Sequence, residues 1–323
     1  MILILSHKSI DRSTEDVIDW LAYKNANFLR LNGSDLQNNL SITFPLSFFG
    51  KEMFESIRAC WFRRWDSSVT FSKALENSTL PVISTLSLQN HLSEEGETIF
   101  AAFWKYIDKK NWLSHPSEVF LNKLITLDCA INLNIEIPKT IITTSKSELI
   151  SFKNKNNRII SKCVGNIPQM RIEDEVLILR TEEVNYEFIN QLPTTFMPSL
   201  FQEYIEKEYE LRIFYLDHKL YSMAIFSQSN PNTKIDFRNI DTKNPNRTVP
   251  YKLPVEVENK LIQLMVDLNI TTGSIDMIKC TDGRYFFLEC NPVGQFGMTS
   301  YPCNYHLEEK IADHLIVLNG KNK

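Results

Sequence analysis

The sequence predicts a mixed α/β fold in three consecutive parts: an N-terminal parallel-sheet domain (residues 1–115), a small central α+β domain (116–195) and a C-terminal sheet domain (196–323). Three observations predict it. A strand, helix and strand pattern occupies the first 31 residues, the pattern resets near residue 115, and strand patterns dominate after residue 196. The 323 residues, 43% hydrophobic and 23% charged, have the composition of an ordinary folded protein.

The first part begins with an apolar strand pattern at residues 2–5. An amphipathic helix with a capping-box start near Ser13 follows, and then a second strand at 28–31. Two strands joined by a helix form a βαβ unit, whose strands are parallel. A further strand at 59–65 contains two arginines, and a helix over 98–110 carries an aromatic stripe that is typical of a core.

The central part combines a helix capped by Ser117 and ending near residue 132 with strands at 136–144, 158–164 and 176–179. The polar stretch 165–174 predicts a hairpin or loop. The last part contains the following predicted elements: strands at 200–205, 211–215 and 220–227, a helix at 257–269, a hairpin at 274–291 and an amphipathic helix at 305–318.

Composition excludes several classes of function. A net charge of −4 argues against a broad surface for nucleic acid or for an anionic membrane. No apolar stretch approaches the roughly 18 residues of a membrane span, and the N-terminus lacks a signal pattern, so we expect a cytoplasmic protein. The six cysteines lack zinc-site spacing, and neither a P-loop nor a Rossmann glycine pattern occurs.

The most informative segment is the predicted hairpin at 274–291. If Asp282 and Gly283 form its two-residue loop, counting outward places Asp276 opposite Glu289. Asn291 then shares the face of Glu289, because side chains alternate along a strand. Two facing carboxylates repel unless a cation or a shared proton lies between them. Oxygen ligands favour Mg²⁺ completed by nucleotide phosphates, although a surface hairpin with solvated acids is the alternative.

Phosphates also require cations, and two lysines are candidates. Lys162 lies in an apolar strand, where a solvated lysine is unusual, and Lys123 lies on an amphipathic helix. Residues 201–205 (Phe-Gln-Glu-Tyr-Ile) form a strand whose backbone could contact an adenine edge. Two short motifs, at 210–212 and 236–238, place an acid two residues before an arginine.

In this order, these residues resemble the ATP-grasp superfamily over essentially the whole chain. The resemblance is strongest to the graspetide synthetases, the microviridin-type ligases that form side-chain ester or amide links in ribosomally made peptides. The supporting motifs lie at residues 61–64 (Trp-Phe-Arg-Arg), 122–123, 137–140, 225–228 and 291–296 (Asn-Pro-Val-Gly-Gln-Phe).

The resemblance implies an ATP-grasp fold and three sets of site residues. The set expected to bind ATP comprises Lys123, Lys162, Gln202, Glu203, Tyr204, Ile205, Glu210 and Asn239, with 203–205 at the adenine and Glu210 at the ribose. The set expected to bind two Mg²⁺ ions comprises Asp276, Glu289 and Asn291. The set expected to stabilise the transferring phosphoryl group or the substrate carboxylate comprises Arg212 and Arg238. One departure from the family pattern is the scarcity of glycine after Lys162.

The implied reaction is ADP-forming activation of Asp or Glu side chains in a precursor peptide, followed by attack of Ser, Thr or Lys. The precursor, with leader and core, is the expected partner; the chain could also form a homo-oligomer. A hairpin within 165–183 is the hypothesised leader-binding element. Three alternatives stay open: an ATP-grasp ligase for a small molecule or a protein C-terminus, a nucleotide-binding module without turnover, and a structural α/β protein.

Overall fold

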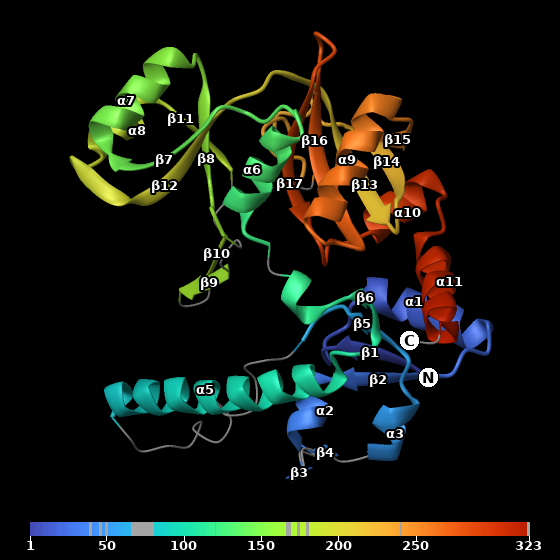
Figure 1. The fold of residues 1–323 in the computed structure, drawn as a ribbon. Helices are drawn as coiled ribbons and strands as arrows, with labels where there is room; N and C mark the ends of the chain where they lie inside the picture. The colour runs from blue at the N-terminus through green and yellow to red at the C-terminus, as the bar shows by residue number, and fades with distance from the viewer. Residues whose placement is uncertain are drawn as a thin grey trace. The chain divides into compact units, whose positions relative to one another are not determined.

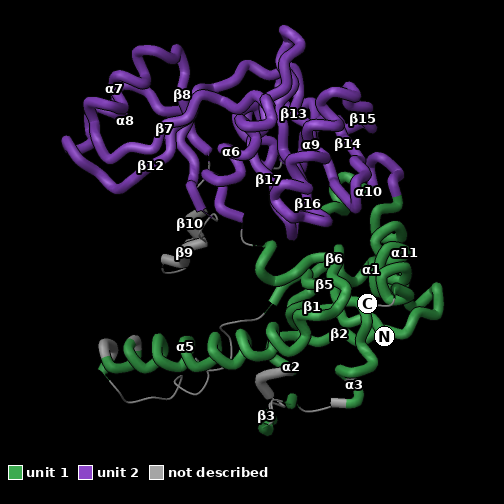
Figure 2. Tube along the Cα trace, in the orientation of Figure 1, with its two compact units in different colours: residues 1–120, 295–300, 306–323 green, residues 121–294, 301–305 purple. Residues whose placement is uncertain are grey.

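The computed structural model describes residues 1–38, 41–44, 47–48, 51–65, 81–119, 121–165, 169–172, 175–178, 181–239 and 241–321. The chain forms two compact units, coloured separately in Figure 2. Unit 1 contains residues 1–120, 295–300 and 306–323, and unit 2 contains residues 121–294 and 301–305. The three-part division with boundaries at 115 and 195 stays a prediction.

Unit 1 is built on a four-stranded parallel sheet with strand order β2-β1-β5-β6. Its strands are β1 (Ile2–Ser6), β2 (Phe28–Asn32), β5 (Ala59–Phe62) and β6 (Asn111–Ser114). Its other elements are α1 (Arg12–Tyr23), α2 (Gly33–Asn38), β3 (Ile42–Thr43), β4 (Ser47–Phe48), α3 (Lys51–Ser56), α5 (Val82–Ile107), the 3₁₀ turn at Pro116–Glu118 and α11 (Leu307–Gly320). The βαβ prediction is confirmed.

Both faces of this sheet are covered. All five residues of β1 are buried, as in a central strand between two layers. The crossovers from β1 to β2 through α1 and from β5 to β6 through α5 run in opposite directions, so right-handed connections place α1 and α5 on opposite faces (Figure 1). Helix α11 packs beside α1, and Trp104 of α5 contacts Phe62 of β5 edge-to-face.

Two helix starts differ from the predictions. Helix α1 begins after Asp11, whose side chain makes no capping hydrogen bond because it is engaged with Thr14 and two arginines. The capping box near Ser13 is therefore wrong. In unit 2, Asn122 caps α6 by accepting from two backbone N–H groups, whereas Ser117 lies within the preceding 3₁₀ turn.

Unit 2 contains a four-stranded antiparallel sheet with strand order β11-β8-β12-β7. Its strands are β7 (Thr140–Ser145), β8 (Ile159–Lys162), β11 (Glu182–Val184) and β12 (Thr195–Glu203), and its helices are α7 (Lys146–Lys155) and α8 (Tyr186–Gln191). The buried core between sheet and helices includes Leu149, Ile189 and Phe201. Strands β9 (Gln169–Ile172) and β10 (Glu175–Ile178) pair antiparallel, as expected for a hairpin.

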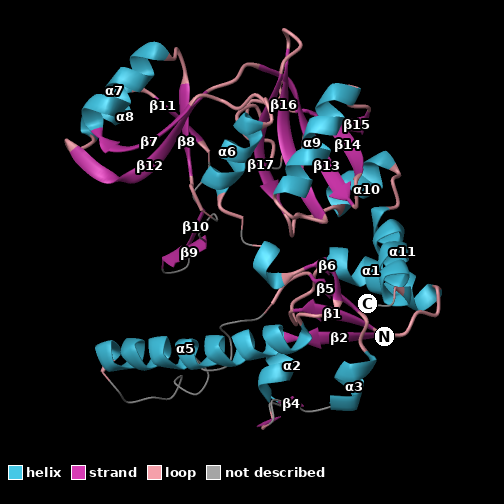
Figure 3. Cartoon of the chain, in the orientation of Figure 1, coloured by secondary structure: helices cyan, strands magenta, loops and turns pink. Residues whose placement is uncertain are grey.

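The second sheet of unit 2 is antiparallel, with strand order β15-β14-β13-β16-β17. Its strands are β13 (Lys207–Leu216), β14 (Lys219–Phe226), β15 (Arg247–Tyr251), β16 (Thr272–Cys280) and β17 (Tyr285–Asn291). Helices α6 (Lys123–Asn132) and α9 (Val255–Asp267) cover one face (Figure 3). Leu211, Ile213, Ile275 and Met277 join this helix-covered core, and because side chains alternate, Arg212 and the residues level with it face the other side.

Helix α10 (Gly297–Cys303) spans the change from unit 1 to unit 2 in the chain. None of the helices in the described ranges is both long enough and apolar enough to span a bilayer.

Candidate functional site

The β16–β17 hairpin places its two acids opposite each other, but not by the predicted turn. Cys280 and Arg284 close a three-residue loop through Cys280 N–H to Arg284 O at 2.9 Å, and Gly283 adopts a positive φ of 96°. The two-residue loop is therefore wrong, and the pairing next to the turn is displaced by one residue. A three-residue loop with glycine in the left-handed region is a common hairpin connection.

A β-bulge in β17 restores the register. Leu288 is the extra residue between the pairs Met277–Phe287 and Asp276–Glu289. The Phe287 N–H donates outside the hairpin, to Glu136 O at 2.8 Å. Without the bulge, Glu289 would share the face of Phe287, which lies in the helix-covered core. The bulge therefore brings Glu289 level with Asp276 on the other face.

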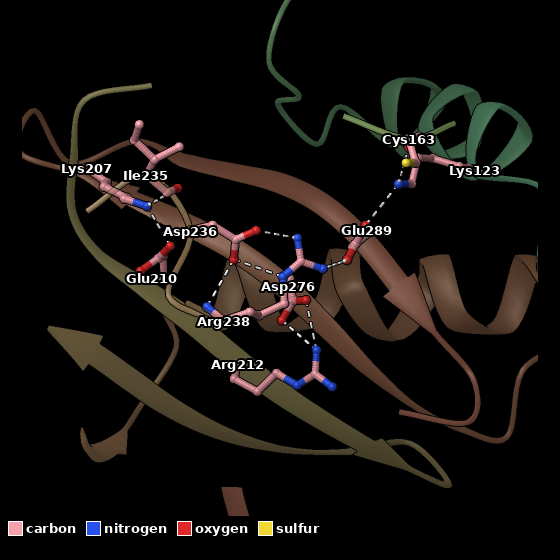
Figure 4. Close-up of polar contacts among 10 residues, drawn as sticks. All are labelled: Lys123, Cys163, Lys207, Glu210, Arg212, Ile235, Asp236, Arg238, Asp276 and Glu289. Atoms are coloured by element: carbon pink, nitrogen blue, oxygen red, sulfur yellow. Dashed lines mark hydrogen bonds and ion pairs between the residues drawn. The ribbon is translucent and has the colours of Figure 1, made fainter. Parts of the chain in front are cut away.

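Asp276 is buried and paired with a cation on the neighbouring strand. Arg212 on β13 lies directly opposite Asp276 in the register, and its Nη1 is 2.8 Å from both carboxylate oxygens (Figure 4). Burial raises the pKa of Asp276, Arg212 opposes the shift, and the nearby Glu289 adds to it. Burial and the second acid both disfavour the charged form of Asp276. A cation that binds beside the two acids would stabilise that charged form.

Glu289 is held by cations from two other elements. Lys123 Nζ at the start of α6 lies 3.1 Å from Glu289 Oε2 and donates to Cys163 O at 3.2 Å. Burial alone would raise the pKa of Glu289, but the charges of Lys123, Lys162 and Arg238 outweigh it and hold the pKa below its usual value. The Lys123 side chain is largely buried, so this lysine does not lie on the solvent-exposed face of its helix.

Lys162, at the end of β8, completes the cationic side of the site. Burial and the positive charge of Lys123 lower its pKa to about 8, while Glu289 opposes the shift. The two ammonium groups repel each other in a partly buried site. An anion that binds between them would stabilise their charged forms. The structure therefore brings together both lysines that the sequence singled out.

Arg238 spans two acids on the same face. Its Nε and Nη2 pair with Asp236 at 2.9 and 2.8 Å, and its Nη1 lies 3.4 Å from Glu289 Oε1. The two hydrogen bonds that Arg238 donates to the Asp236 carboxylate raise the pKa of Arg238. Its side chain is 42% exposed and so accessible to a ligand. Asn239 closes this turn with its backbone N–H on Asp236 O at 3.1 Å.

Two residues at the end of β12 contact the strand β7 and the residue before it. Gln202 is fully buried and donates to Thr140 Oγ1 at 2.8 Å; its Oε1 has no hydrogen-bond partner among the described residues. Glu203 accepts from the Lys139 N–H at 2.9 Å and pairs with its Nζ at 3.1 Å. Both side chains thus fix the point where the chain leaves the first sheet of unit 2 for the second.

The connector after Glu203 is anchored by an arginine that the sequence did not reveal. The Arg158 guanidinium lies 3.8 Å from the Tyr204 ring centroid and pairs with Glu183 and Glu206 at 2.6 Å each. Ile205 packs instead against an apolar cluster of the second sheet. The segment 203–205 is therefore held at both ends.

That apolar cluster lies on the same face as the acids. Ile278 is two residues from Asp276 along β16, and it packs with Cys280, Phe286, Ile205 and Leu288. An apolar patch beside a backbone edge suits an aromatic base. The alternation of apolar residues within the hairpin was the signal for this cluster, but only the bulge at Leu288 decides its face.

Two other predicted residues have internal partners. Glu210 is buried and accepts from Lys207 Nζ at 2.5 Å and from the Ser227 hydroxyl. Burial raises the pKa of Glu210, and Lys207 opposes the shift. Asn291, at the exposed end of β17, accepts from the Val293 N–H through Oδ1 at 3.1 Å. The ribose role of Glu210 and the metal role of Asn291 stay predictions.

The donor set fits magnesium better than a transition metal. The described residues hold no group of three or more His, Cys, Asp or Glu placed to bind an ion. Asp276 and Glu289 supply two facing carboxylates, and Asn291 follows on the same strand as Glu289. Mg²⁺ characteristically takes one or two carboxylates and completes its octahedron with water and substrate phosphates.

Comparisons with known proteins support the fold. No protein-family model and no curated protein matches the chain. A RiPP-associated ATP-grasp ligase of Chryseobacterium gregarium, solved with ADP and a leader and core peptide, is 23% identical, with 98% of this chain and 96% of that chain covered and a TM-score of 0.83.

Two further structures agree over almost the whole chain. The macrocyclase MdnC of Microcystis aeruginosa, bound with precursor peptide MdnA, is 21% identical, covers 98% and 99% of the two chains and has a TM-score of 0.79. The ATP-grasp ligase PsnB, complexed with minimal precursor, Mg and ADP, is 15% identical, covers 98% and 97% and has a TM-score of 0.77. The chain therefore has the fold of the ATP-grasp ligases that are associated with ribosomal peptides, as its motifs predicted.

Proposed function

We propose that this protein is an ATP- and magnesium-dependent ligase that joins Asp or Glu side chains of a ribosomally made precursor peptide to Ser, Thr or Lys side chains of the same peptide. One observation carries the proposal: the facing acids Asp276 and Glu289 lie among Lys123, Lys162 and Arg238 on the open face of a sheet. The ligases of the same fold named above, which were solved with nucleotide or precursor peptide, support the substrate class.

The nucleotide is assigned to the segment 203–205 and the apolar cluster around Ile278. The base would lie against the cluster and the backbone edge, and its phosphates would extend toward Lys123 and Lys162. Each lysine supplies a point charge to a phosphate oxygen. The Mg²⁺, held by Asp276, Glu289 and Asn291, would neutralise phosphate charge when bound.

The chemistry requires activation because a carboxylate is a poor electrophile. A carboxylate oxygen of the peptide attacks the γ-phosphorus of ATP, the bond to the β-phosphate oxygen breaks, and ADP leaves. The peptide hydroxyl or amine then attacks the acyl carbon, loses its proton, and phosphate leaves. Arg238, which is half-exposed beside Glu289, is placed to meet the transferring phosphoryl group. Arg212 is buried against Asp276 and positions that acid.

The hairpin of β9 and β10 is proposed to bind the leader. In the chain it lies between β8 and β11, and the edge of an antiparallel strand pair can bind an extended peptide segment as a further strand. Deletion of residues 169–178 should abolish peptide binding and spare ATP binding. Equal loss of both would contradict this part of the proposal.

The decisive experiment is incubation with ATP, Mg²⁺ and the precursor peptide encoded beside the gene. We expect the peptide to lose the mass of one water per link, with ADP rather than AMP released. Glu289→Gln should abolish turnover, and Glu256→Gln, an exposed acid on α9, is the matched control that should retain it. Full turnover by Glu289→Gln would refute the metal assignment.

A small-molecule carboxylate ligase would behave differently in the same assay. It would release ADP with an amino acid or another small carboxylate and leave the peptide mass unchanged.

A further inference from the structure

The parallel sheet of unit 1 has a switch point at which two of its strands end in polar residues. From β1 the chain proceeds to β2 on one side, while β5 lies on the other side of β1. In open parallel sheets, ligands bind outside the carboxyl ends of the strands at such a point. Here the end of β5 is followed by Arg63 and Arg64, and the end of β1 is followed by His7.

Arg63 forms the buried base of this edge. It is 3% exposed, and its Nε lies 3.3 Å from Asp11 Oδ2. Asp11 also accepts from the Thr14 hydroxyl at 2.8 Å and from Gln295 Nε2 at 3.3 Å. The opposing charge of Arg63 and these hydrogen bonds outweigh burial and hold the pKa of Asp11 below its usual value, so the group is a carboxylate at neutral pH.

Arg64 is more accessible than Arg63. Its backbone N–H donates to Leu5 O of β1, so the residue is fixed beside the end of that strand. Its Nε lies 3.5 Å from Asp11 Oδ2, and the side chain is 41% exposed. Among the described residues this buried Nε makes no hydrogen bond, and neither does the buried Nδ1 of His7 at the end of β1.

One carboxylate thus faces two guanidinium groups at the switch point. A guanidinium is a planar fork that matches a carboxylate with two parallel hydrogen bonds. The Asp11 carboxylate is committed to Arg63 and to its neutral donors, so a second carboxylate would suit Arg64.

We propose that Arg64 and His7, at the carboxyl ends of β5 and β1, form a carboxylate-binding subsite that takes an acidic side chain of the peptide substrate. The inference rests on the proposed function, because it names the part of the peptide substrate that would bind at the carboxyl ends of β5 and β1. Arg63, Asp11 and Gln295 are positioning residues that hold Arg64 in place.

The test measures binding of a fluorescein-labelled precursor peptide by anisotropy, in parallel with a copy whose core Asp and Glu are replaced by Asn and Gln. Arg64→Gln should weaken binding of the acidic peptide roughly tenfold or more, since it removes the charged donor of a hydrogen bond to the peptide carboxylate. The affinity of wild type for the amide peptide should be lower than for the acidic peptide by the same factor. Arg64→Gln should not reduce the affinity for the amide peptide any further, as in a double-mutant cycle.

Two variants control the result. Arg64→Lys keeps the charge without the fork and should give an intermediate loss, while Arg12→Gln, an 80% exposed arginine of the same unit, should bind as wild type. If Arg64→Gln does not fold, the two peptides on wild type still decide, because equal affinity for both overturns the subsite.

The outcomes also separate this inference from the proposed function. Equal binding of the acidic peptide by wild type and folded Arg64→Gln overturns the subsite alone. Competition by inorganic phosphate together with equal affinity for both peptides would indicate a phosphate site instead and overturn the carboxylate assignment. Failure of wild type to bind or modify any precursor overturns the proposed function itself.

Discussion

The buried ion pair between Arg212 and Asp276 gives a strong test of how the site is held together. The two side chains are 9% and 8% exposed, so removal of one partner leaves a charge with little access to water. Breaking such a pair costs about 3–5 kcal/mol. Because 1 kcal/mol shifts the melting temperature of a domain of this size by about 2–4 °C, Arg212→Met should lower it by roughly 6–20 °C.

The loss should depend on pH with a definite sign. Burial already raises the pKa of Asp276 against the opposing charge of Arg212, and removal of that charge raises it further. The folded variant then binds more protons than the unfolded chain at mildly acidic pH, so its stability relative to wild type recovers as the pH falls. The deficit is therefore largest at neutral pH.

The assay is urea unfolding without divalent metal at several pH values, followed by tryptophan fluorescence and circular dichroism. The matched control is Arg284→Met, which breaks the exposed ion pair of Arg284 with Asp282 at the tip of the same hairpin. This substitution should change stability far less. Arg212→Met combined with Asp276→Leu should recover most of the loss, because an apolar pair replaces the stranded charge. Equal effects of Arg212→Met and Arg284→Met at neutral pH would refute the reasoning.

Three further predictions concern packing and nucleotide binding. Gly294→Ala places a Cβ 2.5 Å from the Ser274 side chain and should destabilise the protein by about 1–3 kcal/mol in thermal unfolding, with partial recovery in combination with Ser274→Gly. Lys162→Met should raise the KM for ATP. In wild type, ATP affinity measured by calorimetry should fall as the pH rises through about 8, where this ammonium loses its charge, whereas Lys162→Arg should flatten the profile. Arg158→Met frees the Tyr204 connector and should raise the KM for ATP while kcat is unchanged; a fall in kcat alone would contradict a positioning role.

The hairpin shows how far sequence reasoning reached at the site. Alternating apolar residues around Asp282 and Gly283 located the hairpin, and the pairing of Asp276 with Glu289 is confirmed. The assumed two-residue loop was wrong by one residue, and the bulge at Leu288 compensated for it. No local sequence pattern predicts such a bulge, because its position depends on how the side chains on both faces of β17 pack.

The partners of the charged residues could not be read from the sequence. Spacing suggested that Glu210 and Arg212 act as neighbours, yet Glu210 pairs with Lys207 and Arg212 pairs with Asp276 across the sheet. Asp236 and Arg238 do pair, because a tight turn brings residues two apart together. Local geometry is encoded over a few residues, whereas cross-strand pairing depends on register over the whole sheet.

The sequence by itself determined the α/β class, the order of most strands and helices, and the identity of the acids and lysines, since hydrophobic periodicity and residue chemistry are local properties. Only the tertiary structure decided that Lys123 and Arg238 reach Glu289 and that Arg158 holds Tyr204. These contacts join residues from 46 to 166 positions apart in the printed sequence, and such contacts form only when separately folded elements pack together.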